Sequence, residues 1–432
     1  MLPRALIFLS VALFAAFSLR SQTPAPATLT REQAEQIALA NNPRVRVGDL
    51  QARVQHEVVR ESRSYRLPQI TGNLTGLAAN TGSRLAAGSL GSSRLLQHAA
   101  GGVEMAQLIS DFGRTRSLIG AAQLTEKARQ ADAEASREDV ILAADEVFFQ
   151  ALEAQATLTV ADQTVATRQL LVDQVSALTA SKLKSDLDLS FAQVNLSQAR
   201  LLQLDARNNV ESSQAALSDV LGFDKATHYQ VIDDSSGSLP PLPGDVDKLI
   251  QDALDKRPDL QSQRFTIQAA QRFDKAQKDR FLPTISGMAA VGGTPFGSDV
   301  YFNPRWYGAA GVNVSIPIFN GFRYSAEEKQ AALQISVESE RERNLRDQIA
   351  RDVRAAWLNA NTALQRVTVG RELLTQANTA LDLAQTRYQL GLSSIVELSQ
   401  AQLQQAQAAI GDANARAQYG FALATLKFQT GQ

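Results

Sequence analysis

The chain has 432 residues, enough for two or more domains, with 43 basic and 44 acidic side chains, a net charge of −1 and no cysteine. The lack of cysteine excludes a disulfide framework, a thiolate metal site, a cysteine nucleophile and a lipid anchor on an N-terminal cysteine. The balanced charge argues against a nucleic-acid partner, which usually requires a basic excess.

Residues 1–21 have the features of a secretory signal peptide. Arg4 gives a basic start, an apolar run extends from Leu6 to Phe17, and small residues lie toward its end. This run is too short to cross a bilayer as a helix, and no later segment reaches the roughly 20 apolar residues that a membrane helix needs. If the protein enters a membrane, we therefore expect it to do so as strands.

The rest of the chain consists of two copies of one unit. Residues 38–72 align with residues 253–287 at a constant offset, which pairs Pro68 with Pro283. A segment rich in Ser, Pro, Gly and Asp separates the copies, as expected for a connector. We therefore predict a first repeat over residues 29–223, a linker over 224–244 and a second repeat over 245–432.

Each repeat is predicted to begin with a helix that a proline ends. In the first copy this helix covers residues 31–61 with a turn near Pro43, and Thr30 with Gln33 resembles a capping box. Alternating apolar and small residues then indicate two strands per copy, joined by a long loop rich in glycine and serine. The four predicted strands lie at about 69–78, 103–110, 284–291 and 309–318. Strands of about 9 to 11 residues match a tilted membrane crossing.

Long helices are predicted to complete each repeat, over about 117–221 and 322–430. The segment from Ala121 to Leu221 contains neither glycine nor proline. Apolar residues recur at alternating steps of four and three from Val140 to Val165, as in a heptad seam. A helix of some 60 residues would be on the order of 90 Å long. Because no compact core has that length, we predict a long helical tube or rod.

The predicted fold is therefore mainly α with a small β part. Long antiparallel helical hairpins form the α part, and each chain contributes four transmembrane strands. Four strands cannot close a barrel, and an open edge in lipid leaves unpaired backbone groups. The barrel must then be shared between chains. Two chains would give eight strands and three would give twelve, and a conduit wide enough for solutes favours the larger number.

The order helix, strand, strand, long helical hairpin, given twice after a secretory signal, resembles the TolC family of outer-membrane efflux channels. Local sequences agree, namely Leu67-Pro68, Leu282-Pro283, Ile318-Phe319-Asn320-Gly321, Tyr388-Gln389-Leu390-Gly391-Leu392 and Ile395-Val396-Glu397-Leu398. The resemblance covers nearly the whole mature chain. It implies a homotrimer with a 12-stranded β-barrel in the lipid of the outer membrane and a periplasmic tube (α-barrel) of long helices.

By the same resemblance, the protein is expected to act as the passive, non-enzymatic export duct of a tripartite efflux or type I secretion system. The expected partners are a periplasmic adaptor (membrane fusion) protein and an inner-membrane pump of the RND, ABC or MFS type. A periplasmic coiled-coil scaffold or adhesin without a pore is the alternative, since it would share the signal peptide and the heptads. The paired strands at matching offsets argue against that alternative.

In the family, acidic residues at the hairpin tips form a ring that narrows the periplasmic entrance. The resemblance makes Glu397 the first candidate for this ring, with Asp186 and Asp188 in the matching region of the first repeat. Gln400 stands where a second acid is found. The alternative is that Glu397 and Asp188 are ordinary solvated acids near helix starts, where the helix dipole favours them.

The tips also depart from the family pattern. Lys182 occupies the position equivalent to Gly391, and Ser393 stands where an arginine can link neighbouring hairpins. Asp186 could form substitute ion pairs with Lys182 or Lys184. The resemblance implies that the tips contact the adaptor, although they can also be plain helix–helix turns; these residues are Lys182, Leu183, Lys184, Ser185, Gly391, Leu392, Ser393 and Ser394.

Other candidates are weaker. His56, His98 and His228 are isolated and lack the spacing of metal ligands, so we expect no catalytic residue, metal or cofactor. Trp306 and Tyr307 lie next to the predicted fourth strand, where they could be interface aromatics or could pack within a loop.

Overall fold

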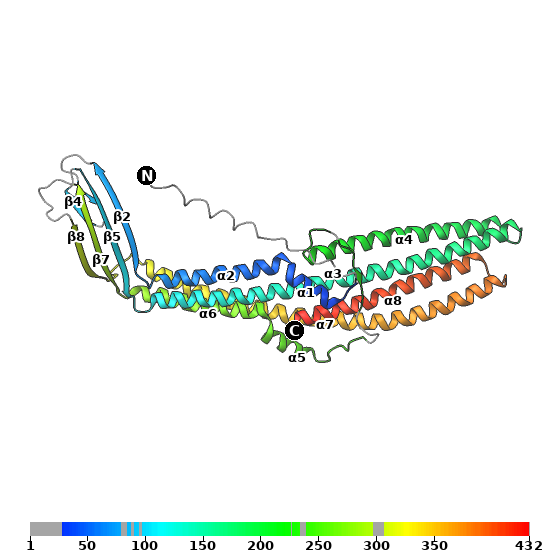
Figure 1. The fold of residues 1–432 in the computed structure, drawn as a ribbon. Coiled ribbons are helices and arrows are strands. Elements are labelled where there is room, and N and C mark those ends of the chain that lie inside the picture. The colour runs from blue at the N-terminus through cyan, green and yellow to red at the C-terminus, as the bar shows by residue number, and fades with distance from the viewer. Residues whose placement is uncertain are drawn as a thin grey trace, which may run out of the picture.

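The computed structural model describes residues 28–78, 84–87, 90–94, 97–225, 227–233, 239–296 and 306–431. The predicted signal peptide at residues 1–21 lies outside this part of the chain. The molecule is elongated, with a small sheet at one end and two helical hairpin tips at the other (Figure 1). The molecule is therefore a long, narrow rod and not a compact globule.

Two shorter helices open each repeat. They are α1 (Arg31–Asn41) and α2 (Pro43–Ser64) in the first, and α5 (Val246–Lys256) and α6 (Pro258–Lys278) in the second. The predicted capping box at the start of α1 is confirmed, because the Gln33 amide donates to Thr30 Oγ1 and the Thr30 amide donates to Gln33 Oε1. Asn42 separates α1 from α2 and caps α2 through the Arg44 amide. Proline at the first position of α2 and α6 sets this break in both copies.

The long hairpins are α3 (Arg114–Ala180) with α4 (Asp186–Val220), and α7 (Arg323–Gln389) with α8 (Ile395–Gln429). Each long arm has 67 residues, or about 100 Å at the rise of an α-helix. Most of the predicted seam is buried: Val140, Ala144, Val147, Ala151, Ala154 and Ala161. Small buried side chains let the helices lie close together over this length.

The sheet has the antiparallel order β2-β5-β7-β8, so β2 and β8 are its two edges. The strands are β2 (Gln69–Ala78), β5 (Gln97–Ser110), β7 (Thr284–Phe296) and β8 (Trp306–Ser315). The prediction was therefore too short for β5 and β7. It also placed β8 too late, since the strand ends before Pro317 and already includes Trp306 and Tyr307.

The first loop between strands is more ordered than predicted. It contains a short antiparallel hairpin of β3 (Arg84–Ala87) and β4 (Leu90–Arg94). The glycine and serine content of this segment predicted a loop, because its two short strands have no clear apolar alternation.

Helices α2, α3, α6 and α7 lie side by side between the sheet and the middle of the molecule (Figure 1), with α3 packed against α2 and α6, and α6 against α7. These four helices thus connect the sheet to the rest of the molecule.

None of the described helices contains an apolar stretch long enough to cross a lipid bilayer.

The linker is fastened to the second hairpin near the middle of the molecule. The indole N–H of Trp357 donates to the Pro243 carbonyl at 2.7 Å, and the hydroxyl of Tyr419 donates to the Pro240 carbonyl at 2.6 Å. Nearby, β1 (Thr28–Leu29) pairs in parallel with β6 (Gln230–Val231). The linker and the β1–β6 pair therefore lie against the long helices at the same level of the molecule.

A buried carboxyl group lies in the core where α1 packs on α3. Asp145 is 5% exposed, and the Nε atom of Arg31 is 3.9 Å from its Oδ1 atom. Burial raises the pKa of Asp145 to about 7; Glu35 adds to the increase, and Arg31 opposes it. Because the folded-state pKa lies above the ordinary value of 3.8, the stabilisation from protonation is complete below about pH 4 and is lost as the pH rises to about 7.

We expect Asp145→Asn to raise the thermal midpoint at pH 8, because the amide removes the cost of ionising a buried group. The gain should shrink toward pH 4, where Asp145 is already protonated. Thermal unfolding followed by circular dichroism of the detergent-solubilised protein at both pH values would measure the change in the thermal midpoint. Asp173→Asn, at an exposed acid on α3, is the control. Equal shifts at pH 4 and pH 8 would contradict the assignment.

Candidate functional site at the hairpin tips

The two hairpins turn with the same backbone geometry. Lys182 and Gly391 both adopt positive φ, at 60° and 73°. The next amide in each turn, of Leu183 or Leu392, donates to a carbonyl five residues earlier at 2.9 Å or 2.8 Å. This is the Schellman arrangement that closes a helix end. The equivalence of Lys182 and Gly391 is confirmed, although the left-handed region costs a lysine roughly 1–2 kcal/mol.

Serine residues begin the second arm of each hairpin. The Asp188 amide donates to Ser185 Oγ at 3.2 Å, and the Asp188 carboxylate accepts from the Ser185 amide at 3.3 Å and its hydroxyl at 2.9 Å. In the second tip, the Glu397 amide donates to Ser394 Oγ at 3.4 Å. All three predicted gate acids, Asp186, Asp188 and Glu397, are therefore in the first turn of a helix, and the Asp188 carboxylate is engaged by its own cap.

The Glu397 carboxylate extends across its hairpin instead. Its Oε1 atom is 3.2 Å from the Nε atom of Arg387 on α7. Arg387, Glu397 and Gln400 line one groove of about 450 Å³. Arg387 was not among the predicted site residues, although counting back from the turn at Gly391 places it opposite Glu397.

Lys184 links the first tip to the second hairpin. Its Nζ atom is 4.3 Å from the centre of the Tyr388 ring, a cation–π contact. Within the described residues of this one chain, no carboxylate lies within 4.0 Å of Lys182 or Lys184, so neither lysine pairs with Asp186 inside the chain. Such pairs between chains stay a prediction. The ring of Tyr388 provides the partner that Lys184 was expected to find in Asp186.

The two hairpins are also joined below their tips. Tyr388 lies in an apolar cluster with Leu171, Val175, Ile395 and Leu398. Burial, and secondarily the charge of Asp188, raise the pKa of the Tyr388 hydroxyl.

A polar contact continues this link. The Asn195 side-chain amide donates to Ser399 Oγ at 2.6 Å, and the guanidinium of Arg168 donates to the Asn195 carbonyl at 2.7 Å. Arg168 is buried, and burial lowers its pKa. The tips thus form one packed unit within the chain.

The ends of the tips are exposed and apolar. Leu183 is 71% exposed and Leu392 is 68% exposed, and Leu187, Leu390 and Val396 are also exposed. Ser185 and Ser394 stand beside them at the surface, while Ser393 is half-buried. Exposed leucines at the extremity of a long molecule are typical of a surface that meets another protein.

The remaining candidates do not form a site. His56 contacts Glu126 and His228 contacts Glu211, each at 2.8 Å, and the side chain of His98 is outside the described part. Among the residues that the structure describes, no three potential metal ligands come together.

Tandem long hairpins joined at one end to an antiparallel four-stranded sheet define the class of outer-membrane export channels. The chain belongs to the outer membrane efflux protein family, whose model matches residues 35–223 and 249–432. It is 24% identical over 389 residues to outer membrane protein TolC of Escherichia coli, covering 85% of this chain and 75% of the relative.

Two further comparisons agree. The solvent efflux pump outer membrane protein SrpC of Pseudomonas putida is 26% identical over 377 residues, covering 84% of this chain and 77% of the relative. The crystal structure of the Campylobacter jejuni CmeC outer membrane channel has a TM-score of 0.79 at 18% identity, covering 96% of this chain and 90% of the other. The protein is an outer-membrane channel of an efflux system, from a family of transport proteins, and the scaffold alternative is not favoured.

We expect Ser185→Ala to loosen the first turn of α4, because it removes both the side-chain cap and one partner of Asp188. Loss of such a cap costs about 1 kcal/mol, or roughly fivefold faster local exchange. Hydrogen exchange of a peptide covering residues 185–190 would measure this. Ser190→Ala is the control, since its hydroxyl only donates to the Asp186 carbonyl at 2.9 Å. Identical exchange in both variants would refute the capping role.

Proposed function

We propose that three copies of the chain assemble into one export channel, with the β8 edge of each chain paired to the β2 edge of the next. The observation that carries this proposal is the four-stranded sheet with two edges that no strand of the described chain covers. Its surface includes exposed Ile70, Leu74 and Val312, which suit contact with lipid. Free strand edges in lipid are costly, and twelve strands enclose a wider lumen than eight.

In this trimer the long hairpins would continue the duct through the periplasm. The duct would be passive, with no catalytic step of its own, and an inner-membrane pump of RND, ABC or MFS type would supply the energy through a periplasmic adaptor. The naming of the relative SrpC as the outer-membrane protein of a solvent efflux pump supports this kind of partner.

The adaptor would dock on the tips. The contact surface comprises Lys182, Leu183, Lys184, Ser185, Gly391, Leu392, Ser393 and Ser394. Support comes from the exposure of Leu183 and Leu392 and from the shared backbone turn. A partner that covers these leucines would remove apolar surface from water, which favours association.

The periplasmic gate would lie at the same end. Three copies of Glu397 around the trimer axis would attract cations and repel one another. Arg387, 3.2 Å away, would offset part of this charge. Gln400 would line the same entrance without a charge. Asp186 and Asp188 would add to it more weakly, since the cap at Ser185 already engages the Asp188 carboxylate.

We expect Glu397→Gln to lower the cation-to-anion permeability ratio in a planar bilayer roughly twofold or more, because one charge per chain leaves the entrance. Arg387→Gln should raise the ratio, because it removes the offsetting cation. Asp186→Asn and Asp188→Asn should have smaller effects.

The control is Asp382→Asn, at an exposed acid on α7 away from the turn. If Glu397→Gln and Asp382→Asn change the ratio equally, Glu397 is not part of a gate. If the purified protein inserts but never conducts, the channel proposal itself fails.

The trimer has a separate test. Native mass spectrometry of the protein extracted in mild detergent should give three chains per particle. Because the chain has no cysteine, a cysteine introduced in β2 and another in β8 can form only the intended cross-link. Cross-linked species larger than two chains are expected, and a ladder that stops at the dimer would exclude the trimer.

A further inference from the structure

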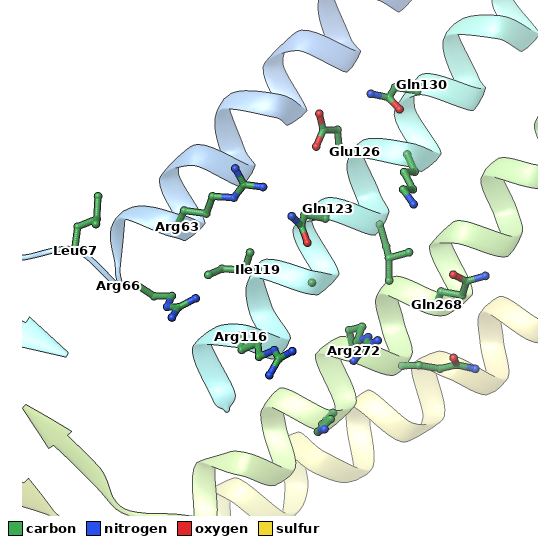
Figure 2. A pocket seen from close by; sticks show the side chains of 15 residues that line it. Arg63, Arg66, Leu67, Arg116, Ile119, Gln123, Glu126, Gln130, Gln268 and Arg272 are labelled. Atoms are coloured by element: carbon green, nitrogen blue, oxygen red, sulfur yellow. The ribbon is translucent and has the colours of Figure 1, made fainter. Parts of the chain in front are cut away.

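A basic hollow lies where the helices meet the sheet. It has a volume of about 1400 Å³ and is bordered by α2, α3 and α6 (Figure 2). Four glutamines line it. It also contains six cationic side chains: Arg63, Arg66, Arg116, Lys127, Arg272 and Lys275.

The charge in this hollow is unbalanced. Glu126 is its only lining acid, and the carboxylate of Glu126 is 2.8 Å from His56 Nδ1. In the described part of the chain, none of the six cations has a carboxylate within 4.0 Å, whereas other arginine and lysine side chains form eighteen ion pairs with carboxylates. Since the whole chain has a net charge of −1, this is a local excess and not a general property. Unpaired cations that share a hollow repel one another unless an anion joins them.

The hollow opens on one face of the helical wall. Helices α2, α3 and α6 are consecutive neighbours in one layer. Arg63 from the end of α2, Arg116 from α3 and Arg272 from α6 all line this one hollow (Figure 2). Side chains converge on the concave face of a curved layer and diverge on its convex face. In a tube, the concave face lines the lumen.

We propose that the hollow is an anion-binding section of the duct, which takes solutes through their phosphate or carboxylate groups. This inference rests on the proposed channel. Guanidinium groups bind such oxygens in pairs, and glutamine amides can donate to the oxygens that remain. The section lies directly beside the sheet, at the opposite end of the helices from Glu397. The duct thus presents acids at its periplasmic entrance and cations near its outer end.

The test uses inorganic tripolyphosphate on the outer side of the channel in a planar bilayer, from which it reaches the hollow without passing the tips. Tripolyphosphate should block the wild-type current from this side. The double variant Arg116→Gln/Arg272→Gln should need roughly tenfold more for the same block, because two charge-assisted contacts per chain are lost. Arg343→Gln/Arg346→Gln is the matched control, since it removes two exposed arginines of α7 outside the hollow.

Conduction without block, or equal loss of block in both double variants, would overturn the proposal. Phospholipid is the other source of phosphate groups. If blocking is absent but the purified wild type retains more phospholipid than Arg116→Gln/Arg272→Gln, the hollow faces lipid and the luminal assignment is wrong. If no protein conducts, the proposed channel fails first. Titration calorimetry of tripolyphosphate into the purified protein then decides the anion site alone, and equal affinity in both double variants would refute it.

Discussion

The structure depends on close packing of long helices through small side chains. Most of the buried positions along α3 and α7 are alanine or valine, and a large share of each helix surface stays exposed in the single chain. Burial per residue is low, so stability must accumulate along the whole length of the seams and not in one core. The same seams keep the wall one helix thick, which allows polar surface on both of its sides.

Residues with positive φ mark the ends of these helices at matching places in the two repeats. Positive φ occurs at Phe112 and Gly113 before α3, and at Gly321 and Phe322 before α7. Gly222 and Gly431 close α4 and α8 in the same conformation. The repeat is therefore preserved in the backbone even where the side chains differ.

Local signals explain what the sequence could predict. The long helices follow from periodicity and from the distribution of glycine and proline, the capping box at Thr30 follows from its local sequence, and the tip acids were located by the family resemblance. The ends of β5 and β7 depend on pairing between distant strands, and the β1–β6 pair joins two-residue segments about 200 residues apart. Arg387 and the Lys184–Tyr388 contact were missed because they depend on how side chains cross a turn.

The two tips share a backbone but differ in chemistry, with Lys182 and a self-capped Asp188 in one, and Gly391 and a Glu397–Arg387 pair in the other. In the proposed trimer, two tips in each of three chains would give about six turns around one axis. A partner that recognises only the backbone turn would find six equivalent binding sites. A partner that recognises the charges would find two kinds of binding site, with three of each. The stoichiometry of docking would then follow from which of these features the partner reads.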